Sequence, residues 1–89
     1  MKAKSGFILR NLVGEYVLAP TGERIRDFRD VILMNELSAF IWERLQSEIS
    51  RQQLLDSILY EYEIDKATAA DDMDAALKKM MSIGIIYIT

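Results

Sequence analysis

The sequence predicts a small α+β domain with three N-terminal antiparallel strands, a three-helix bundle and a short C-terminal strand or tail. The chain has 89 residues, of which 51% are hydrophobic, so we expect residues 1–89 to form one domain around one core. Strand-like runs occupy the chain before residue 35, and apolar residues recur at helical spacing after it. A sheet and helices closing a shared core satisfy both patterns.

The first two strands are expected at residues 6–10 and 15–19, which are rich in aromatic and β-branched residues. Gly14 lies between them and predicts a short turn. Residues 20–22, Pro-Thr-Gly, end the second strand, because proline presets a turn and cannot donate to a ladder. The charged residues 23–30 then form a loop or a blunted strand end.

Two apolar side chains, Ile25 and Phe28, interrupt this charged segment, and we expect both to pin it to the body of the domain. A third strand follows at residues 31–34, Val-Ile-Leu-Met, and is apolar at every position. A strand with one face in solvent would alternate apolar and polar residues along the sequence. Either both faces are covered, as in a central strand, or one face awaits a partner.

The first two helices have clear start signals. Asn35 is a good N-cap for the first, whose apolar stripe runs beside Trp42, an expected core anchor. Ser50 and Gln53 form a capping box for the second. Helical spacing then predicts that Leu54 and Ile58 face the core.

The third helix is expected to begin after Asp65 and to end at Gly84 as a left-handed cap, followed by a strand or packed tail at residues 85–88. Its apolar stripe consists of Ala69, Met73, Ala76, Leu77 and Met80. The methionines either fill the core or form an adaptable binding surface, and core filling is favoured for Met73 and Met80. Met81 lies off the stripe, so we expect it to be exposed.

The composition excludes several kinds of site. The chain has no cysteine and no histidine, so thiolate nucleophiles, disulfides and the commonest base and metal ligand are absent. Asp71, Asp72 and Asp74 are interpreted as charges that suit the dipole of the third helix, with lysines later, and not as a metal cluster. We therefore expect no cofactor, no metal and no enzyme activity.

Charge and hydropathy also bear on partners. A net charge of -3 disfavours nucleic-acid binding, and the acidic start of the third helix would repel phosphates if helices two and three formed a helix-turn-helix. No apolar run approaches the roughly 20 residues that cross a bilayer, so no membrane partner is expected. The sequence favours a soluble cytoplasmic protein.

Several segments resemble a family signature in their order and spacing. They are residues 16–23, residues 31–45 with Asn35, Glu36, Ala39, Trp42 and Leu45, and residues 72–85. On these residues, which span nearly the whole chain, the sequence resembles the coenzyme PQQ synthesis protein D (PqqD) family. The resemblance implies a winged-helix-like fold known as the recognition element of RiPPs, the ribosomally made and post-translationally modified peptides. It links the chain to PQQ or other RiPP biosynthesis.

The resemblance further implies a non-catalytic peptide chaperone. Members bind the leader part of a precursor peptide as an added strand beside the third strand and third helix, and present it to a maturase, commonly a radical SAM enzyme. Ala76 stands where larger apolar residues are common, which leaves the pocket shape open. The predicted peptide-binding residues are Val31, Ile32, Leu33, Met34, Ala69, Met73, Ala76, Met80 and Met81.

Two alternatives stay open. The edge strand or the tail could instead form a homodimer in a structural domain without a peptide ligand, and a DNA-binding regulator is a weaker third.

Three arginines either lie on a solvated loop or pair with acidic residues of the leader: Arg24, Arg26 and Arg29.

Overall fold

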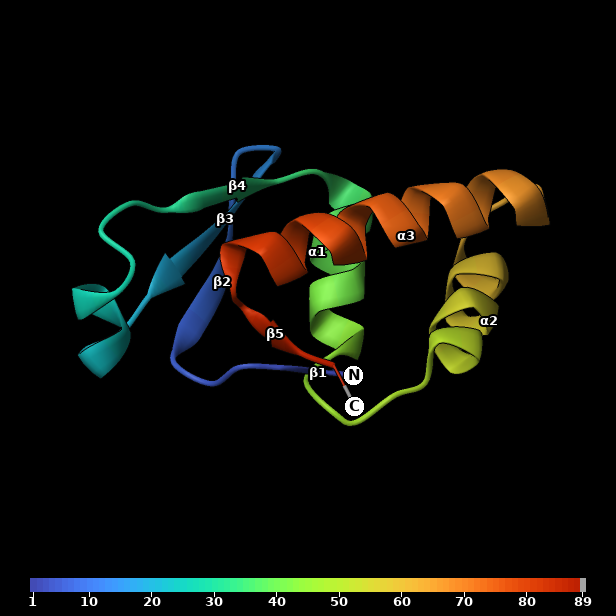
Figure 1. The fold of residues 1–89 in the computed structure, drawn as a ribbon. Helices are drawn as coiled ribbons and strands as arrows, with labels where there is room; N and C mark the ends of the chain where they lie inside the picture. Colours follow the sequence, from blue (N-terminus) through green and yellow to red (C-terminus); the bar gives the residue numbers. More distant parts are fainter. Residues whose placement is uncertain (89) are drawn as a thin grey trace.

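The computed structural model describes residues 1–88 and confirms the α+β class (Figure 1). The elements follow one another as β1 (Lys2–Ala3), β2 (Phe7–Leu12), β3 (Glu15–Pro20), the 3-10 helix η1 (Gly22–Arg26), β4 (Ile32–Met34), α1 (Glu36–Arg44), α2 (Arg51–Glu61), α3 (Lys66–Ile83) and β5 (Ile86–Tyr87). Thr89, the last residue of the predicted domain, lies outside the described residues.

The main sheet is antiparallel, with the strand order β2-β3-β4. The β3–β4 register places Val17 opposite Leu33 and Leu18 opposite Ile32. Among the described residues, β3 is the only strand that pairs with β4. The apolar strand that the sequence left undecided is therefore an edge strand and not a central one.

A second ribbon joins the two ends of the chain. β1, which the sequence did not predict, pairs antiparallel with β5 through Lys2–Tyr87 and Ala3–Ile86. Ala3 N donates to Leu45 O at 2.7 Å and fastens this ribbon to the end of α1, and Lys4 N donates to Ile85 O at 2.9 Å between the two sides of the ribbon. The predicted C-terminal strand thus exists, but it pairs with β1 and leaves the free edge of β4 uncovered.

The predicted helix signals are confirmed by their hydrogen bonds. The side chain of Asn35 accepts from Ser38 N at 2.8 Å, and Ser50 and Gln53 bond reciprocally as a capping box. The side chain of Asp65 accepts from Thr68 N at 3.0 Å at the start of α3. At the other end Gly84 has φ +88°, and Ile85 N donates to Met80 O at 3.1 Å. These local bonds determine where the chain turns toward each helix.

The core is shared by the three helices: α1 packs on β3 and β4 of the sheet, and α3 packs on α1, α2 and β5. Its largest fully buried side chains are Leu18, Ile41, Leu45, Leu54, Ile58, Met73 and Ile85. Trp42 is only 3% exposed and meets Phe7 edge to face at 5.8 Å, so its prediction as a core anchor is confirmed. Met73 and Met80 are also buried, as core filling predicted.

Two expectations about charged segments need correction. Phe28 does pin its loop, packing edge to face on Phe7 at 5.1 Å, but Ile25 is 57% exposed and holds nothing. The first turn of α3 contains no acidic residue and its last turn no basic residue. Because the dipole effect fades beyond the end turns, it does not explain the aspartates of α3. Asp74 instead forms an ion pair with Arg51 of α2.

Candidate functional site

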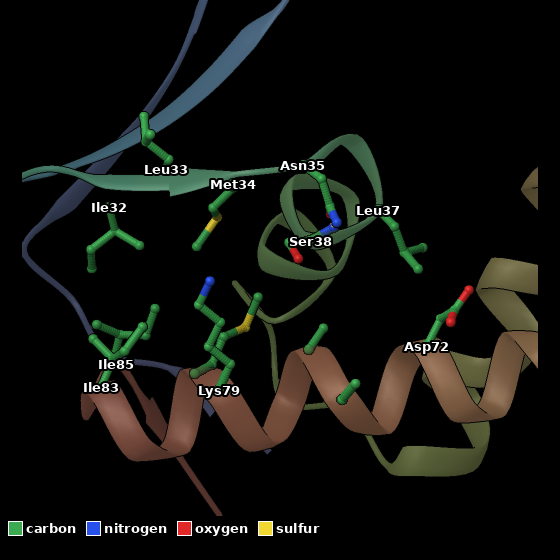
Figure 2. Close-up of a pocket in the computed structure, with 13 residues that line it drawn as sticks. Ile32, Leu33, Met34, Asn35, Leu37, Ser38, Asp72, Lys79, Ile83 and Ile85 are labelled. Carbon is green, nitrogen blue, oxygen red and sulfur yellow. The ribbon is translucent and has the colours of Figure 1, made fainter.

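A groove lined by both apolar and polar residues lies between the free-edged strand β4 and the helix α3 (Figure 2). Its volume is about 440 Å³. The strand, the start of α1, one stripe of α3 and the start of the C-terminal tail line it through Ile32, Leu33, Met34, Asn35, Leu37, Ser38, Asp72, Ala75, Ala76, Lys79, Met80, Ile83 and Ile85. The groove and the unpaired edge of β4 therefore adjoin one another.

The strand β4 alternates in space although its sequence does not alternate in polarity. Figure 2 shows Ile32 and Met34 extending toward α3, whereas Leu33 extends to the other side of the strand. Ile32 and Met34 are partly buried, and Leu33 is 65% exposed. Because successive side chains of a strand point to opposite faces, one apolar face of β4 forms a wall of the groove and the other meets solvent.

The facing wall is a single stripe of α3. Residues 72, 76, 79 and 83 follow one another at steps of three or four, so they lie on one side of the helix. Ala75 and Ala76 are small and leave room above the middle of the helix, while Met80 and Ile83 add apolar surface toward β5. The small side chain of Ala76 therefore lies where it widens the groove.

Two charged side chains line this groove, Asp72 and Lys79, together with the polar residues Asn35 and Ser38. Lys79 extends from α3 toward β4, and Asp72 lies near Leu37 at the other end (Figure 2). Neither takes part in an ion pair within residues 1–88, where the pairs are Met1–Glu48 and Arg51–Asp74. The groove thus carries one uncompensated charge of each sign.

Five of the nine predicted site residues line the groove, although the side chain of Leu33 extends to the other side of β4: Ile32, Leu33, Met34, Ala76 and Met80. Ala69 and Met73 lie in the core with no exposed surface, and Val31 lies just before β4 with 54% of its surface exposed. Met81 is exposed, as expected, but does not line the groove. Of the three aspartates that were assigned to the helix dipole, Asp72 lines the groove and Asp74 faces α2.

Sequence reasoning missed several lining residues. They are Asn35, Leu37, Ser38, Asp72, Ala75, Lys79, Ile83 and Ile85. A signal for part of this set exists in the sequence, because the stripe through Ala76 continues at helical steps to positions 72, 79 and 83. The contribution of α1 has no such signal, since only the turn after β4 places Leu37 beside α3.

The arginine segment contributes nothing to this groove. Arg24 Nε donates to Ser5 O at 2.9 Å, and the guanidinium lies 5.8 Å from the centre of the Phe7 ring. Arg26 and Arg29 are exposed. Arg24 therefore holds the start of β2 in place, and the solvated-loop interpretation describes the other two.

An edge strand beside a groove with apolar walls on β4 and α3 defines a class of domain that can accept an extended segment as an added strand. Main-chain groups of the edge offer hydrogen bonds, and the groove offers room for alternate side chains of the segment. The chain belongs to the coenzyme PQQ synthesis protein D (PqqD) family, whose family model matches residues 7–86.

Two solved structures share the fold. TbiB1 in complex with the TbiA(beta) leader peptide is 19% identical, with a TM-score of 0.74 and full coverage of both chains. Lasso peptide synthetase B1 complexed with the leader peptide is 17% identical, with a TM-score of 0.71, over 98% of this chain and 96% of that one. No curated protein is significantly similar in sequence. Within residues 1–88, no helix has the length and hydropathy needed to cross a membrane.

Proposed function

We propose that this protein is a non-catalytic adaptor that binds the leader segment of a ribosomally made precursor peptide and presents it to a maturase. The observation that carries the proposal is the free edge of β4 beside the groove of about 440 Å³. The leader adds a strand to β4, and every second side chain enters the groove. A radical SAM enzyme is the maturase class that the family favours, and the cytoplasm is the expected compartment.

Three further observations support this function. The chain belongs to the PqqD family, and both similar structures are complexes with a leader peptide. The wall residues Ile32 and Met34 are apolar and suit uncharged side chains of a guest strand. The two ionisable groups of the groove are seven residues apart on α3, about 10.5 Å along its axis, too far for a paired acid and base.

A titration of the ¹⁵N-labelled protein with a precursor peptide encoded beside its gene tests the proposal. We expect the backbone amides of Ile32–Met34 and of the stripe at residues 72–83 to shift together. The amides of η1, away from the groove, serve as the internal control. If the protein stays folded and binds the peptide while β4 remains silent, the site is elsewhere.

A homodimer without a peptide ligand is the second candidate, because several apolar side chains beside the free edge of the sheet are exposed. Ile8, Val31 and Leu33 are 44%, 54% and 65% exposed, and the register places Leu33 opposite Val17. Such surface beside a free edge also favours pairing between two copies. Sedimentation velocity across a wide concentration range distinguishes the candidates. A dimer whose mass does not change when the precursor is added would favour the homodimer without a peptide ligand.

A further inference from the structure

The two charges of the groove point to the chemistry of its guest. We propose that Lys79 is a specificity-determining residue that selects an extended peptide with an aspartate or glutamate at the groove-facing position opposite it. At the other end, Asp72 selects against a carboxylate and for a basic or neutral side chain. This inference rests on the proposed function and names the peptide class: a strand whose groove-facing side is apolar with a fixed order of charge.

The position of Lys79 on α3 deprives it of a partner within its own helix. The residues three and four positions away are Ala75, Ala76, Ser82 and Ile83, and none is acidic. Its neighbour Lys78, by contrast, stands four residues after Asp74. Because helical side chains pair at these spacings, Lys78 has an acidic neighbour on its own helix and Lys79 does not. No ion pair of Lys79 occurs in the described chain.

Asp72, a negative charge, likewise has no partner of opposite charge on its own helix. The residues three and four positions away from it are Thr68, Ala69, Ala75 and Ala76, none of them basic. Its carboxylate lies near Leu37, at the end of the groove where α1 begins (Figure 2). The groove therefore presents two charges that the described chain leaves without a counter-ion, one at the end where α1 begins and one farther along α3.

Binding changes the energetics of these charges. A guest strand between β4 and α3 removes water from Lys79, whose amine extends toward β4 (Figure 2). Covering a charge without a partner costs free energy, whereas a carboxylate on the guest offsets that cost through a charge-assisted hydrogen bond. The same carboxylate placed at the Asp72 end meets a like charge. The order of charge thus distinguishes one direction and register of the guest from the others.

Geometry relates the charges to positions on the guest. Seven helical residues separate Asp72 from Lys79, a distance of about 10.5 Å along α3. Groove-facing residues of a strand recur every two residues, or about 6.7 Å. The acidic and basic positions of the guest are therefore two or four residues apart, and both belong to the same alternate set.

An array of immobilised synthetic peptides tests this inference. Each peptide has about 11 residues, more than the roughly five that span the stripe of α3 at residues 72–83 at about 3.3 Å each. Apolar residues alternate with Ser or Thr, and one groove-facing residue is varied among Glu, Gln and Lys. We expect labelled wild-type protein to retain Glu peptides about tenfold better than Gln peptides, as one charge-assisted bond implies. The preference should weaken as salt is added.

Three variants sharpen the comparison. Lys79→Gln should abolish the preference for Glu over Gln, and Lys79→Glu should reverse it in favour of Lys. Lys78→Glu, on the adjacent residue outside the groove, is the matched control and should keep the wild-type preference. Circular dichroism of each variant verifies that it is folded, and the uncharged Lys79→Gln serves if Lys79→Glu does not fold.

The outcomes separate the two claims. If peptides bind and shift the amides of β4 but Glu, Gln and Lys are equivalent, the charge selection is wrong while the proposed function stands. If neither the array nor the encoded precursor perturbs β4 in a folded protein, both are wrong. A Glu preference that survives in Lys79→Gln would assign the selection to another residue and overturn the role of Lys79.

Discussion

Arg51 and Asp74 join α2 to α3 through a two-point ion pair. Arg51 Nε donates to Asp74 Oδ1 at 2.9 Å, and Arg51 Nη2 donates to Asp74 Oδ2 at 2.6 Å. Arg51 is the first residue of α2, and Asp74 lies in the middle of α3. The contact fixes how α2 lies against the side of α3 away from the groove, so it bears on stability and not on the site.

This ion pair predicts a pH-dependent difference between the wild type and Asp74→Asn. The hydrogen bond from Arg51 lowers the pKa of Asp74 in the folded protein. The pair therefore stabilises the fold fully above about pH 4, near the ordinary Asp pKa, and its contribution is lost as the pH falls through the lower folded-state value. We expect a small stability deficit of Asp74→Asn at pH 7, because both side chains are half exposed.

Thermal unfolding at pH 7 and at pH 2 measures this effect. The deficit of Asp74→Asn should shrink toward zero at the lower pH. Asp71→Asn, an exposed carboxylate three residues away on the same helix, is the control and should match the wild type at pH 7. A deficit for Asp74→Asn that is as large in acid as at neutral pH would contradict the role of the ion pair.

Trp42 is predicted to be the most costly side chain of α1 to truncate. It is 3% exposed and contacts Phe7 edge to face. Trp42→Ala should destabilise the domain by about 3–5 kcal/mol, which is comparable to the whole stability of a small domain. Urea unfolding followed by far-ultraviolet circular dichroism measures the loss. Tyr60→Ala, 92% exposed on α2, should change stability by less than about 0.5 kcal/mol.

Gly84 tests the cost of the left-handed end of α3. Its φ is +88°, and a Cβ added there would meet nothing within 4 Å, so any penalty comes from the backbone. Gly84→Ala should cost about 1–2 kcal/mol, and Gly84→Asn should cost less, because asparagine tolerates this conformation better. Chemical denaturation with unchanged m-values measures both. Equal stability of the alanine variant and the wild type would contradict this account of the cap.

Ala76 is predicted to control the width of the groove. Its small side chain lines the middle of the wall formed by α3 and is only partly buried. Ala76→Leu should fill the groove and weaken leader binding at least about tenfold, since a displaced apolar side chain of the guest loses its burial. Isothermal titration with the encoded precursor measures the affinity.

The matched control for Ala76→Leu is Ala67→Leu, an exposed position in the first turn of the same helix and outside the groove. It should bind as tightly as the wild type. Both variants should unfold at similar denaturant concentrations, because neither residue is fully buried. Undiminished binding by Ala76→Leu would place the guest somewhere other than this groove.

The residues that were predictable are those whose partners are close in sequence. Asn35, Ser50 and Asp65 bond to groups three residues away, and Gly84 ends α3 through bonds to residues three and four positions earlier. Strand β1 was missed because its two residues have no pattern and pair with β5 at the other end of the chain. The prediction that Ile25 pins its loop was wrong, because hydropathy alone does not show whether an apolar side chain has other side chains to pack against.

The site also combines features that nearby residues specify with features that depend on distant parts of the chain. Ile32, Met34, Ala76 and Met80 were predicted from apolar patterns, but the same stripe of α3 includes Met73, which lies in the core. Helical spacing does not indicate which part of a stripe the other elements cover. Lys79 was missed because its place in the groove depends on β4 lying across from α3, and the two segments are more than 40 positions apart in the sequence.

By itself, the sequence determined the α+β class, the starts of the three helices and the left-handed end of α3, because hydrogen bonds and side-chain periods within a few residues specify them. Only the tertiary structure decided that β4 is an edge strand and that β5 pairs with β1 instead of covering it. Which strand lies beside which is a matter of long-range packing, where many pairings bury similar apolar area and only the whole core selects among them.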